Sequence, residues 1–331
     1  MYTDHRPENW ANVLPVVTWS PGLTRHALHG PTMGTRYSAV FTAPAYFALG
    51  PLGTTLQAAV DAVDRQMSNW RPDSDISRFN AAEAGVWVAV EADLLEVVET
   101  GIEIGRRSGG AFDIGLGAIV DAWGFGPLRS TPDVNAIGTL SHSGQRPLTD
   151  VLELDRRNAR IRKLAPLQLD LCGIAKGFGV DQLARSLDAH GIANYLVSID
   201  GELRAKGERP DGGPWNVAVE RPDRFARTIV STIALKDQAI ATSGDYRHWQ
   251  ELDGRRVSHT MDPQTGQPVD NHLASVTVMA ANAMAADAWA TALLVAGEAA
   301  GPAMAEANGL HALFIVRHDD ELFELPIGKF A

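Results

Sequence analysis

LDLCGIAKGFGVD, the stretch from Leu169 to Asp181, indicates the fold of this chain more clearly than any other segment. An apolar run that carries Asp170 breaks at Gly173, and Lys176 follows where an amphipathic helix is expected to begin. Free backbone N–H groups at a helix start, together with a lysine, can hold an anion such as a phosphate. Neither of the common phosphate-binding motifs, the P-loop pattern and GxGxxG, occurs in this stretch. The alternative to an anion site is an ordinary strand–turn–helix whose lysine is solvated.

Hydrophobic patterns on either side of this turn predict separate helices and runs of strands. Helices are expected over Thr54–Asn69, Asp93–Arg107, Phe178–His190 and Ala283–Ala296. Asp93 is placed to cap the second helix, and Gly109-Gly110 to end it. Strands are expected over Arg36–Thr42, Asn194–Ile199, Trp215–Val219, Thr228–Ala234, Ala274–Met279 and Ala312–Val316. This order favours an α+β architecture over a doubly wound sheet.

The chain is expected to fold as one domain. Residues 1–30, with several Pro and His, are typical of a loosely ordered lead-in, and residues 31–331 form the domain, with a weakly marked division near residue 150. Gly126–Gln145 is rich in Pro, Gly and Ser and indicates a long excursion.

Composition excludes several classes of protein. The chain has 331 residues, 45% of them apolar, as in ordinary globular proteins. A net charge of −11 with no basic stripe argues against a nucleic-acid partner. No apolar run approaches the roughly 20 residues that span a bilayer. The N-terminus lacks the pattern of a signal peptide, and the one cysteine, Cys172, cannot form an intrachain disulfide. We therefore expect a cytoplasmic protein.

SHTMDPQTGQP, from Ser258 to Pro268, places a histidine directly before a turn. Histidine is the side chain best suited to take a proton from a hydroxyl near neutral pH. His259 is therefore a candidate general base. The alternative is a solvated loop residue, because the chain has ten histidines.

AADAWAT, from Ala285 to Thr291, places a carboxylate and a hydroxyl four residues apart on one helix face. With a carbonyl from an irregular turn, Asp287 and Thr291 make an all-oxygen site for a hard cation such as Mg²⁺. The alternative is an aspartate in the first turn of a helix, where the helix dipole favours it.

MSNWRPDSDISRFN, from Met67 to Asn80, places Trp70 in a polar loop just past a helix end. The indole either covers the edge of the core or stacks on a planar ligand. Three polar residues nearby are candidates to cap the following turn: Asp75, Ser77 and Asn80. The glycine-dense segment that carries Asp113 lets the backbone approach a ligand closely.

In order along the chain stand MGTRY, MSNWRPDSDISRFN, GGAFDIGLG, LDLCGIAKGFGVD, IDGELRAKG, ATSGDYRHW, SHTMDPQTGQPV and AADAWATALLVAG. This series resembles the ApbE family of FAD:protein FMN transferases, over about residues 28 to 300. The resemblance implies an α+β, T-fold-like arrangement of antiparallel sheets flanked by helices. FAD would lie in a cleft between two halves.

The resemblance also implies a reaction. Members use FAD and Mg²⁺ to attach FMN to a Thr or Ser hydroxyl of another flavoprotein, and they release AMP. Asp287, Thr291 and the main-chain carbonyl of Ala175 would hold Mg²⁺, and Lys176 would lie beside the phosphates as a point charge. His259 would be the general base, and Asp262 would orient it or bind the flavin.

Trp70 stands where the family often has a tyrosine stacked on the isoalloxazine. The other positions in motifs that line the FAD pocket are Met33, Ser68, Asp113, Lys176, Asp200, Gly201, Thr242, Ser243 and His259.

The chain departs from the family pattern in two places. Many members are exported lipoproteins, whereas this chain shows no export signal, so we expect a cytoplasmic location, or a periplasmic one if such a signal has been removed. Cys172-Gly173 replaces the usual glycine pair, which we expect to add a small buried side chain that narrows the turn.

Two other functions remain in view. A non-catalytic FAD-binding protein would need neither His259 nor the Asp287/Thr291 pair. A Mg²⁺-dependent FAD pyrophosphatase, giving FMN and AMP, would use the same residues with water in place of the acceptor hydroxyl.

Overall fold

An eight-stranded antiparallel sheet is the central element of the computed structural model, which describes residues 22–128, 131–142, 146–222, 228–244, 249–252, 255–319 and 321–331. The strand order is β1-β2-β6-β7-β10-β15-β16-β17. The strands are β1 (Leu23–Thr32), β2 (Thr35–Pro44), β6 (Tyr195–Ile199), β7 (Glu202–Lys206), β10 (Ala239–Gly244), β15 (Leu273–Ala280), β16 (His311–His318) and β17 (Glu321–Ile327).

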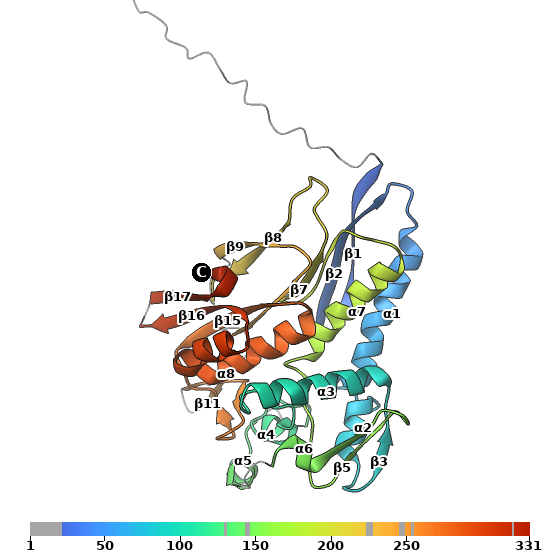
Figure 1. Ribbon diagram of the computed structural model, residues 1–331. Coiled ribbons are helices and arrows are strands. Elements are labelled where there is room, and N and C mark those ends of the chain that lie inside the picture. The colour runs from blue at the N-terminus through green and yellow to red at the C-terminus, as the bar shows by residue number, and fades with distance from the viewer. Residues whose placement is uncertain are drawn as a thin grey trace, which may run out of the picture.

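Three long helices pack on one face of this sheet: α1 (Leu49–Met67), α7 (Ala175–Ala189) and α8 (Ala283–Ala307). α1 buries Leu52, Leu56, Val60 and Val63, a spacing of three and four that puts them on one side of a helix. Alternate residues of β6 are buried beneath α7 and α1, as expected for a strand with one covered face. This apolar layer fixes where the N-termini of α7 and α8 meet (Figure 1).

The other half of the molecule is mainly helical and carries a small three-stranded sheet in the order β3-β5-β4 (Figure 1). Its helices are α2 (Asp75–Ala81), α3 (Ala92–Arg107), α4 (Gly117–Ala122), α5 (Val134–His142) and α6 (Leu148–Val151). Its strands are β3 (Trp87–Ala89), β4 (Leu152–Asp155) and β5 (Arg160–Lys163). The largest core cluster joins α3 of this half to α8, so the two halves share one hydrophobic core.

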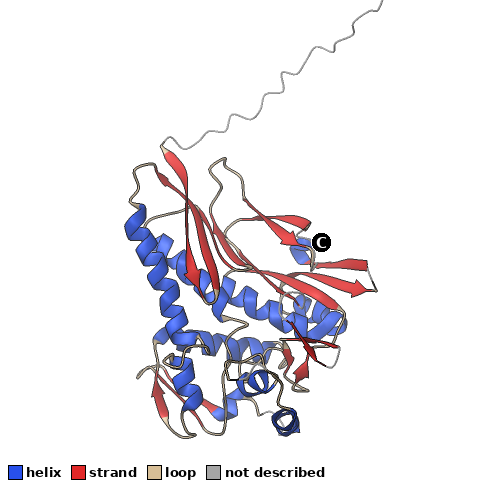
Figure 2. Ribbon diagram, turned by 180° about the vertical axis from the view of Figure 1, so that it is seen from behind, coloured by secondary structure: helices blue, strands red, loops and turns tan. Residues whose placement is uncertain are grey.

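The second face of the large sheet is covered by a hairpin, β8 (Trp215–Glu220) and β9 (Ile229–Leu235). Figure 2 shows this hairpin from the side opposite the helices. Trp215 and Val217 pack on Leu203 and Ile240 of the sheet. Four short strands follow β10 along the chain: β11 (Trp249–Leu252), β12 (Arg255–Ser258), β13 (Met261–Asp262) and β14 (Gln267–Pro268).

A small apolar cluster stands apart from the main core. It joins α4 and α5 to the loop after β12, and we call it the satellite cluster; its buried members are Leu116, Ile119, Ala122, Trp123, Ile137 and Met261. The segment expected as an irregular excursion is thus partly helical. Ile137 of α5 is buried in the cluster, which gives that helix its tertiary support.

The α+β class and the four helices expected from the sequence are confirmed, with boundaries shifted by a few residues and α8 extended past a break at Gly297. The first strand begins at Leu23, inside the expected lead-in, whereas residues 1–21 lie outside the described residues. None of the helices within the described ranges is both long and apolar enough to cross a membrane.

Two local expectations were wrong. Glu91, not Asp93, is the N-cap residue of α3, and the Asp93 carboxylate instead accepts a hydrogen bond from Gln182 Nε2 at 3.2 Å. The alternative strand–turn–helix interpretation also fails, because the run before Gly173 is not a strand. Its one ladder contact is an isolated bridge between Gln168 and Leu116, and side chains of the α1–α2 region hold its backbone.

Candidate functional site

A cavity of about 1180 Å³ is lined from both halves of the molecule and from the β8 strand. This volume exceeds the roughly 300–1,000 Å³ of typical small-molecule sites, so an extended, dinucleotide-sized ligand fits. Every site residue expected from the sequence lines it except Asp262. Residues 245–248, in the motif ATSGDYRHW, lie outside the described residues.

The turn before α7 is less open to anions than its sequence suggested. The Cys172 N–H donates to Asp170 Oδ1 at 2.8 Å, and the Ala175 N–H donates to the Leu171 carbonyl at 2.8 Å. The Gly177 N–H donates to Asp287 Oδ2 at 2.9 Å. These N–H groups already have acceptors, so the first turn of α7 holds a protein carboxylate rather than forming a free phosphate cradle.

Gly177 lets α7 and α8 meet backbone to backbone. A Cβ atom at this position would lie 2.3 Å from the Ala283 carbonyl oxygen and 2.8 Å from Asp287 Cβ. Asp181, one turn further along α7, accepts the Ala283 and Met284 N–H groups at 3.0 and 2.9 Å. The start of α8 is therefore held on α7, and Asp287 is fixed beside Lys176.

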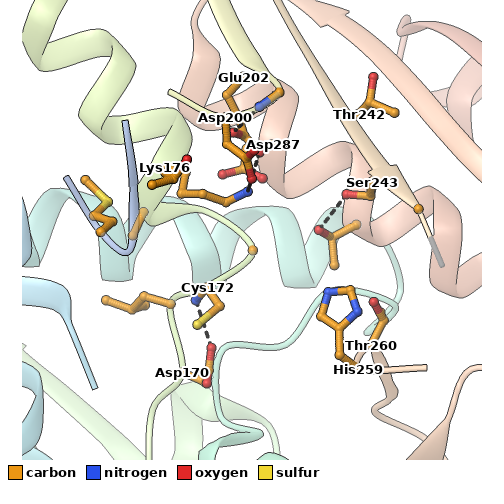
Figure 3. Close-up of a pocket in the computed structure, with 18 of the residues that line it drawn as sticks. Asp170, Cys172, Lys176, Asp200, Glu202, Thr242, Ser243, His259, Thr260 and Asp287 are labelled. Carbon is orange, nitrogen blue, oxygen red and sulfur yellow. Dashed lines mark hydrogen bonds and ion pairs between the residues drawn. The ribbon is translucent and has the colours of Figure 1, made fainter. Parts of the chain in front are cut away.

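Lys176 lies among three carboxylates (Figure 3). Its Nζ is 2.8 Å from Glu202 Oε1 and 3.6 Å from Asp200 Oδ2. Burial acts to lower the pKa of Lys176, but the carboxylates of Glu202, Asp287 and Asp200 outweigh it and hold that pKa above its ordinary value. The lysine is therefore a fixed positive charge, and its nearest partners are protein carboxylates.

Glu202 is a site residue that the sequence analysis missed. Its side chain is only 3% exposed, and burial raises its pKa while Lys176 opposes that rise. Glu202 Oε2 also accepts the Gly201 N–H at 3.2 Å. A usable signal was present: an acid at the start of β7, two residues after Asp200, can face the same side of the backbone.

Asp287 is 4% exposed, and its environment disfavours a negative charge. Burial, followed by repulsion from Glu202, raises its pKa to about 7, although Lys176 and the Gly177 N–H oppose the shift. Asp287 is also not in the first turn of α8, because Asn282 caps that helix. The simple explanation of a first-turn aspartate therefore fails.

The oxygen atoms around Asp287 fit a hard cation. Three carboxylates surround one lysine, so the cluster has an excess of negative charge that burial makes costly. Thr291 lies one helical turn further along α8 and lines the same cavity, as does Ala175. Among the described residues, no group of three or more His, Cys, Asp or Glu side chains is arranged to hold a metal ion, so a cation here would need hydroxyl and main-chain oxygens.

The Thr291 hydroxyl is positioned by its neighbours. Its Oγ1 is 3.1 Å from Ser243 Oγ on β10, and a Cβ at Gly173 would lie 3.1 Å from the same atom. The bare backbone at Gly173 therefore lets the turn approach α8. The next hydroxyl along β10, that of Thr242, is 2.9 Å from Thr277 Oγ1.

His259 projects into the cavity from a separate loop, away from the Lys176 cluster (Figure 3). Its ring is half-buried and meets Phe125 edge to face, with centroids 6.4 Å apart. The loop is held by the satellite cluster, where Trp123 Nε1 donates to the Gly266 carbonyl at 3.0 Å. The structure therefore places His259 inside the site rather than on a solvated surface loop.

Asp262 is the one candidate that the structure does not bring into the cavity. Its Oδ1 accepts the Gln264 N–H at 2.8 Å, and its Oδ2 accepts the Thr265 hydroxyl at 3.0 Å. Both oxygens thus stabilise the turn after β13. The hydrogen bonds of the turn account for both carboxylate oxygens, and a role for Asp262 in orienting His259 or binding the flavin stays a prediction.

Trp70 is 67% exposed and lines the cavity, so it does not cover the core edge. Its loop is fixed from both sides. Ser74, rather than any of the three expected residues, caps α2 through its hydroxyl. Asn80 Oδ1 accepts the Leu169 N–H at 2.8 Å, and its Nδ2 donates to the Leu169 carbonyl at 2.9 Å. The Trp70 loop is thereby tied to the turn before α7.

The remaining candidates also line the cavity. Asp113 accepts the Gly115 N–H at 2.7 Å, and burial raises its pKa. Met33 and Asp200 both adopt a left-handed backbone, with φ of 45° and 54°, and Gly201 follows Asp200 in the turn between β6 and β7. Ser68 is the C-cap residue of α1.

The exposure of the Cys172 side chain differs from what we expected from the sequence. The side chain is exposed and lines the cavity instead of being buried in the turn. The neighbouring Asp170 carboxylate raises the pKa of the thiol well above its ordinary value, so the thiol is protonated and neutral near pH 7.

Comparisons with known proteins agree on one family. The sequence profile of the ApbE family matches residues 33–314. A protein of Vibrio cholerae named FAD:protein FMN transferase is 40% identical over 328 residues, which cover 97% of this chain and 98% of that protein. The Escherichia coli K12 protein of the same name is 35% identical and covers 88% of this chain and 84% of its own length.

Solved structures give the same result. The flavin transferase ApbE from Vibrio cholerae superimposes with a TM-score of 0.83 and 38% identity, over 93% of this chain and 98% of that one. The apo form of the flavinyl transferase ApbE from Pseudomonas stutzeri gives a TM-score of 0.82 at 38% identity, over 92% and 95%.

Proposed function

The chain belongs to the ApbE family, and from that premise we propose that it transfers FMN from FAD to a hydroxyl of another protein. The acceptor residue would be a Thr or Ser, and the other product AMP. The observation that carries this proposal is the single cavity that collects Lys176, Asp287 and Thr291 on one side and His259 on another. A site that only bound FAD would not need a base opposite a charged cluster.

Mg²⁺ is part of the proposal. Asp287, Thr291 and the main-chain carbonyl of Ala175 would hold it, because all three line the cavity next to an excess of buried negative charge. When bound, it would neutralise charge that builds on the pyrophosphate during transfer. Asp287 would then be ionised, since a neighbouring cation opposes the burial that raises its pKa.

In the transfer step, a bond forms between the acceptor hydroxyl oxygen and the FMN-side phosphorus of FAD. The bond from that phosphorus to the bridging oxygen breaks, and AMP leaves with this oxygen. His259 would take the hydroxyl proton, a role for which imidazole is suited near neutral pH. Lys176, whose charge is fixed by Glu202 and Asp200, would lower the electrostatic cost of the anionic phosphates nearby.

The flavin would lie against Trp70. The indole is 67% exposed and offers an apolar face to a planar ring. Because its loop is already fixed, little conformational entropy would be lost on binding. The other FAD contacts would come from the lining residues Met33, Ser68, Asp113, Asp200, Gly201, Thr242 and Ser243.

The test is to incubate the protein with FAD and Mg²⁺, with and without candidate flavoproteins. Two products are measured: free AMP in solution, and flavin bound covalently to the acceptor, by its fluorescence in denaturing gels. We expect AMP to form with the acceptor and the acceptor to gain the mass of FMN. His259→Ala should lose this activity, whereas His29→Ala, at an exposed histidine on β1, should keep it. AMP without acceptor would indicate an FAD pyrophosphatase. Tight FAD binding with no AMP would indicate a binding protein.

A further inference from the structure

Two of the most exposed large apolar side chains follow, along the chain, the segment Phe125–Pro127 that lines the cavity. Leu128 is 75% exposed and Val134 is 79% exposed. Apolar side chains scattered singly over a surface need no explanation, whereas exposed apolar side chains that gather in one place mark a contact surface. The question is whether these two lie together and what would cover them.

Both residues are anchored at the end of α4. The Leu128 N–H donates to Asp121 Oδ1 at 2.9 Å. The Asp133 N–H donates to the carbonyl of Ala122 at 2.8 Å, and Val134 directly follows Asp133. Because Asp121 and Ala122 are consecutive, these bonds hold the backbone at Leu128 and at Asp133 to the same end of α4. We call this surface, Leu128 and Val134, the α4–α5 tip.

The tip is continuous with the cavity wall and with the loop that carries His259. Phe125, Gly126 and Pro127 line the cavity, and Leu128 is the next residue. Phe125 contacts the His259 ring, and Ile137, one helical turn after Val134, is buried in the satellite cluster with Met261. The tip is therefore joined to the His259 loop through Phe125 and through the satellite cluster.

We propose that the α4–α5 tip is the docking surface for the acceptor protein, which would place an apolar side chain next to its modified hydroxyl on Leu128 and Val134. This rests on the proposed function. With FAD in the cavity, the acceptor would bring its hydroxyl to His259 from outside, and the tip is an exposed apolar surface, among the described residues, that is joined to the His259 loop. Docking there removes two exposed apolar side chains from water.

The test compares two double variants for transfer to an acceptor protein that the wild-type chain flavinylates. Leu128→Ser with Val134→Ser changes the tip. Phe323→Ser with Leu325→Ser is the matched control, because these exposed apolar residues lie on β17 and outside the cavity lining. We expect the tip variant to raise KM for the acceptor at least about tenfold, through the loss of apolar contacts. The affinity for FAD, measured by quenching of flavin fluorescence, should be unchanged.

The outcomes separate this inference from the proposed function. If the wild-type chain transfers no FMN to any protein, the proposed function fails. If it does and the tip variant behaves like the β17 control, the docking surface is wrong. If the tip variant only converts a wild-type dimer to a monomer, with the acceptor KM unchanged, the tip binds a second copy of this chain and the proposal is overturned. A lower FAD affinity in the tip variant would also count against it.

Discussion

The two sides of the cavity are built differently. Lys176 and Asp287 lie on α7 and α8, whose backbones touch at Gly177 and whose apolar faces belong to the main core. His259 lies on a loop that a small satellite cluster holds against α4 and α5. The comparison indicates that the charged side is fixed by the fold itself, whereas the base is positioned by a few replaceable contacts. Binding and catalytic residues are commonly carried on loops that a rigid scaffold positions.

The largest effect is expected from Asp287→Asn, which removes the carboxylate from the charged side. FMN transfer should fall by about 10³-fold or more, because the cation would lose its charged ligand. The measurement is the rate of AMP release across a range of Mg²⁺ concentrations. Asp270→Asn, at an exposed residue, is the control. Activity that survives in Asp287→Asn at saturating Mg²⁺ would mean that the cation does not depend on this residue.

The same substitution should stabilise the metal-free fold. Because the pKa of Asp287 is raised to about 7, the native state holds a proton that the unfolded chain releases above about pH 4. Stability is therefore lost as pH rises from about 4 to about 7, and Asp287→Asn removes this loss. We expect a gain on the order of 2 kcal/mol at about pH 8, shrinking as the pH falls through that window. Urea unfolding in EDTA measures it, and equal stability of the two proteins at every pH would contradict the argument.

His259→Asn tests the other side. Transfer should fall by about 10²-fold or more, the usual contribution of a positioned base. The free energy of unfolding and the affinity for FAD should stay close to wild type, because the ring is only half-buried and packs on the satellite cluster. Asp262→Asn is a matched control on the same loop, outside the cavity. A comparable loss of transfer in this control would support a direct role for Asp262.

Trp70→Ala should weaken FAD binding without weakening the fold. KM for FAD should rise about tenfold, the loss expected when an aromatic contact is removed. An indole that is 67% exposed contributes little to the core, so the unfolding midpoint should not move. Trp70→Phe should recover most of the affinity. Steady-state kinetics at saturating acceptor decide this, and an unchanged KM would place the flavin elsewhere.

The smallest effect is expected from Trp123→Phe, which keeps the apolar ring and removes the hydrogen bond to the Gly266 carbonyl. A lost bond of this kind costs about 1 kcal/mol of folding stability, and transfer should slow by no more than about fivefold while FAD affinity stays the same. A larger loss of FAD binding than of transfer would show that the satellite cluster also supports the charged side.

The four longest helices and most of the long strands could be predicted from the sequence, because their apolar residues follow helical or strand periods. The short strands β3, β4 and β5 could not, since three or four residues carry too little pattern and their stability comes from pairing with one another. β17 was missed for a related reason. It is an edge strand in which Phe323 and Leu325 remain exposed, so it lacks the alternation of a half-buried strand.

In the candidate site, too, only local sequence signals could be used. Residues that residue type and local motif identify could be predicted, among them Lys176, His259 and Asp287. Properties that depend on contacts between residues far apart in the sequence could not be predicted. The acceptor of the Gly177 N–H is 110 residues away, and the exposure of Cys172 depends on a turn held by Asn80. Asp262 is the opposite case, because a residue that stands in a functional motif makes the hydrogen bonds of a local turn and lies outside the cavity lining.

The backbone contact of α7 and α8 at Gly177 sets the distance between these two helices. No side chain stands between the two backbones there, and even a methyl group would meet the Ala283 carbonyl at 2.3 Å. The spacing between Lys176 and Asp287 is therefore insensitive to exchanges of the surrounding core side chains. In engineering terms, the core can be redesigned for heat resistance around this glycine, and the glycine itself must be left alone.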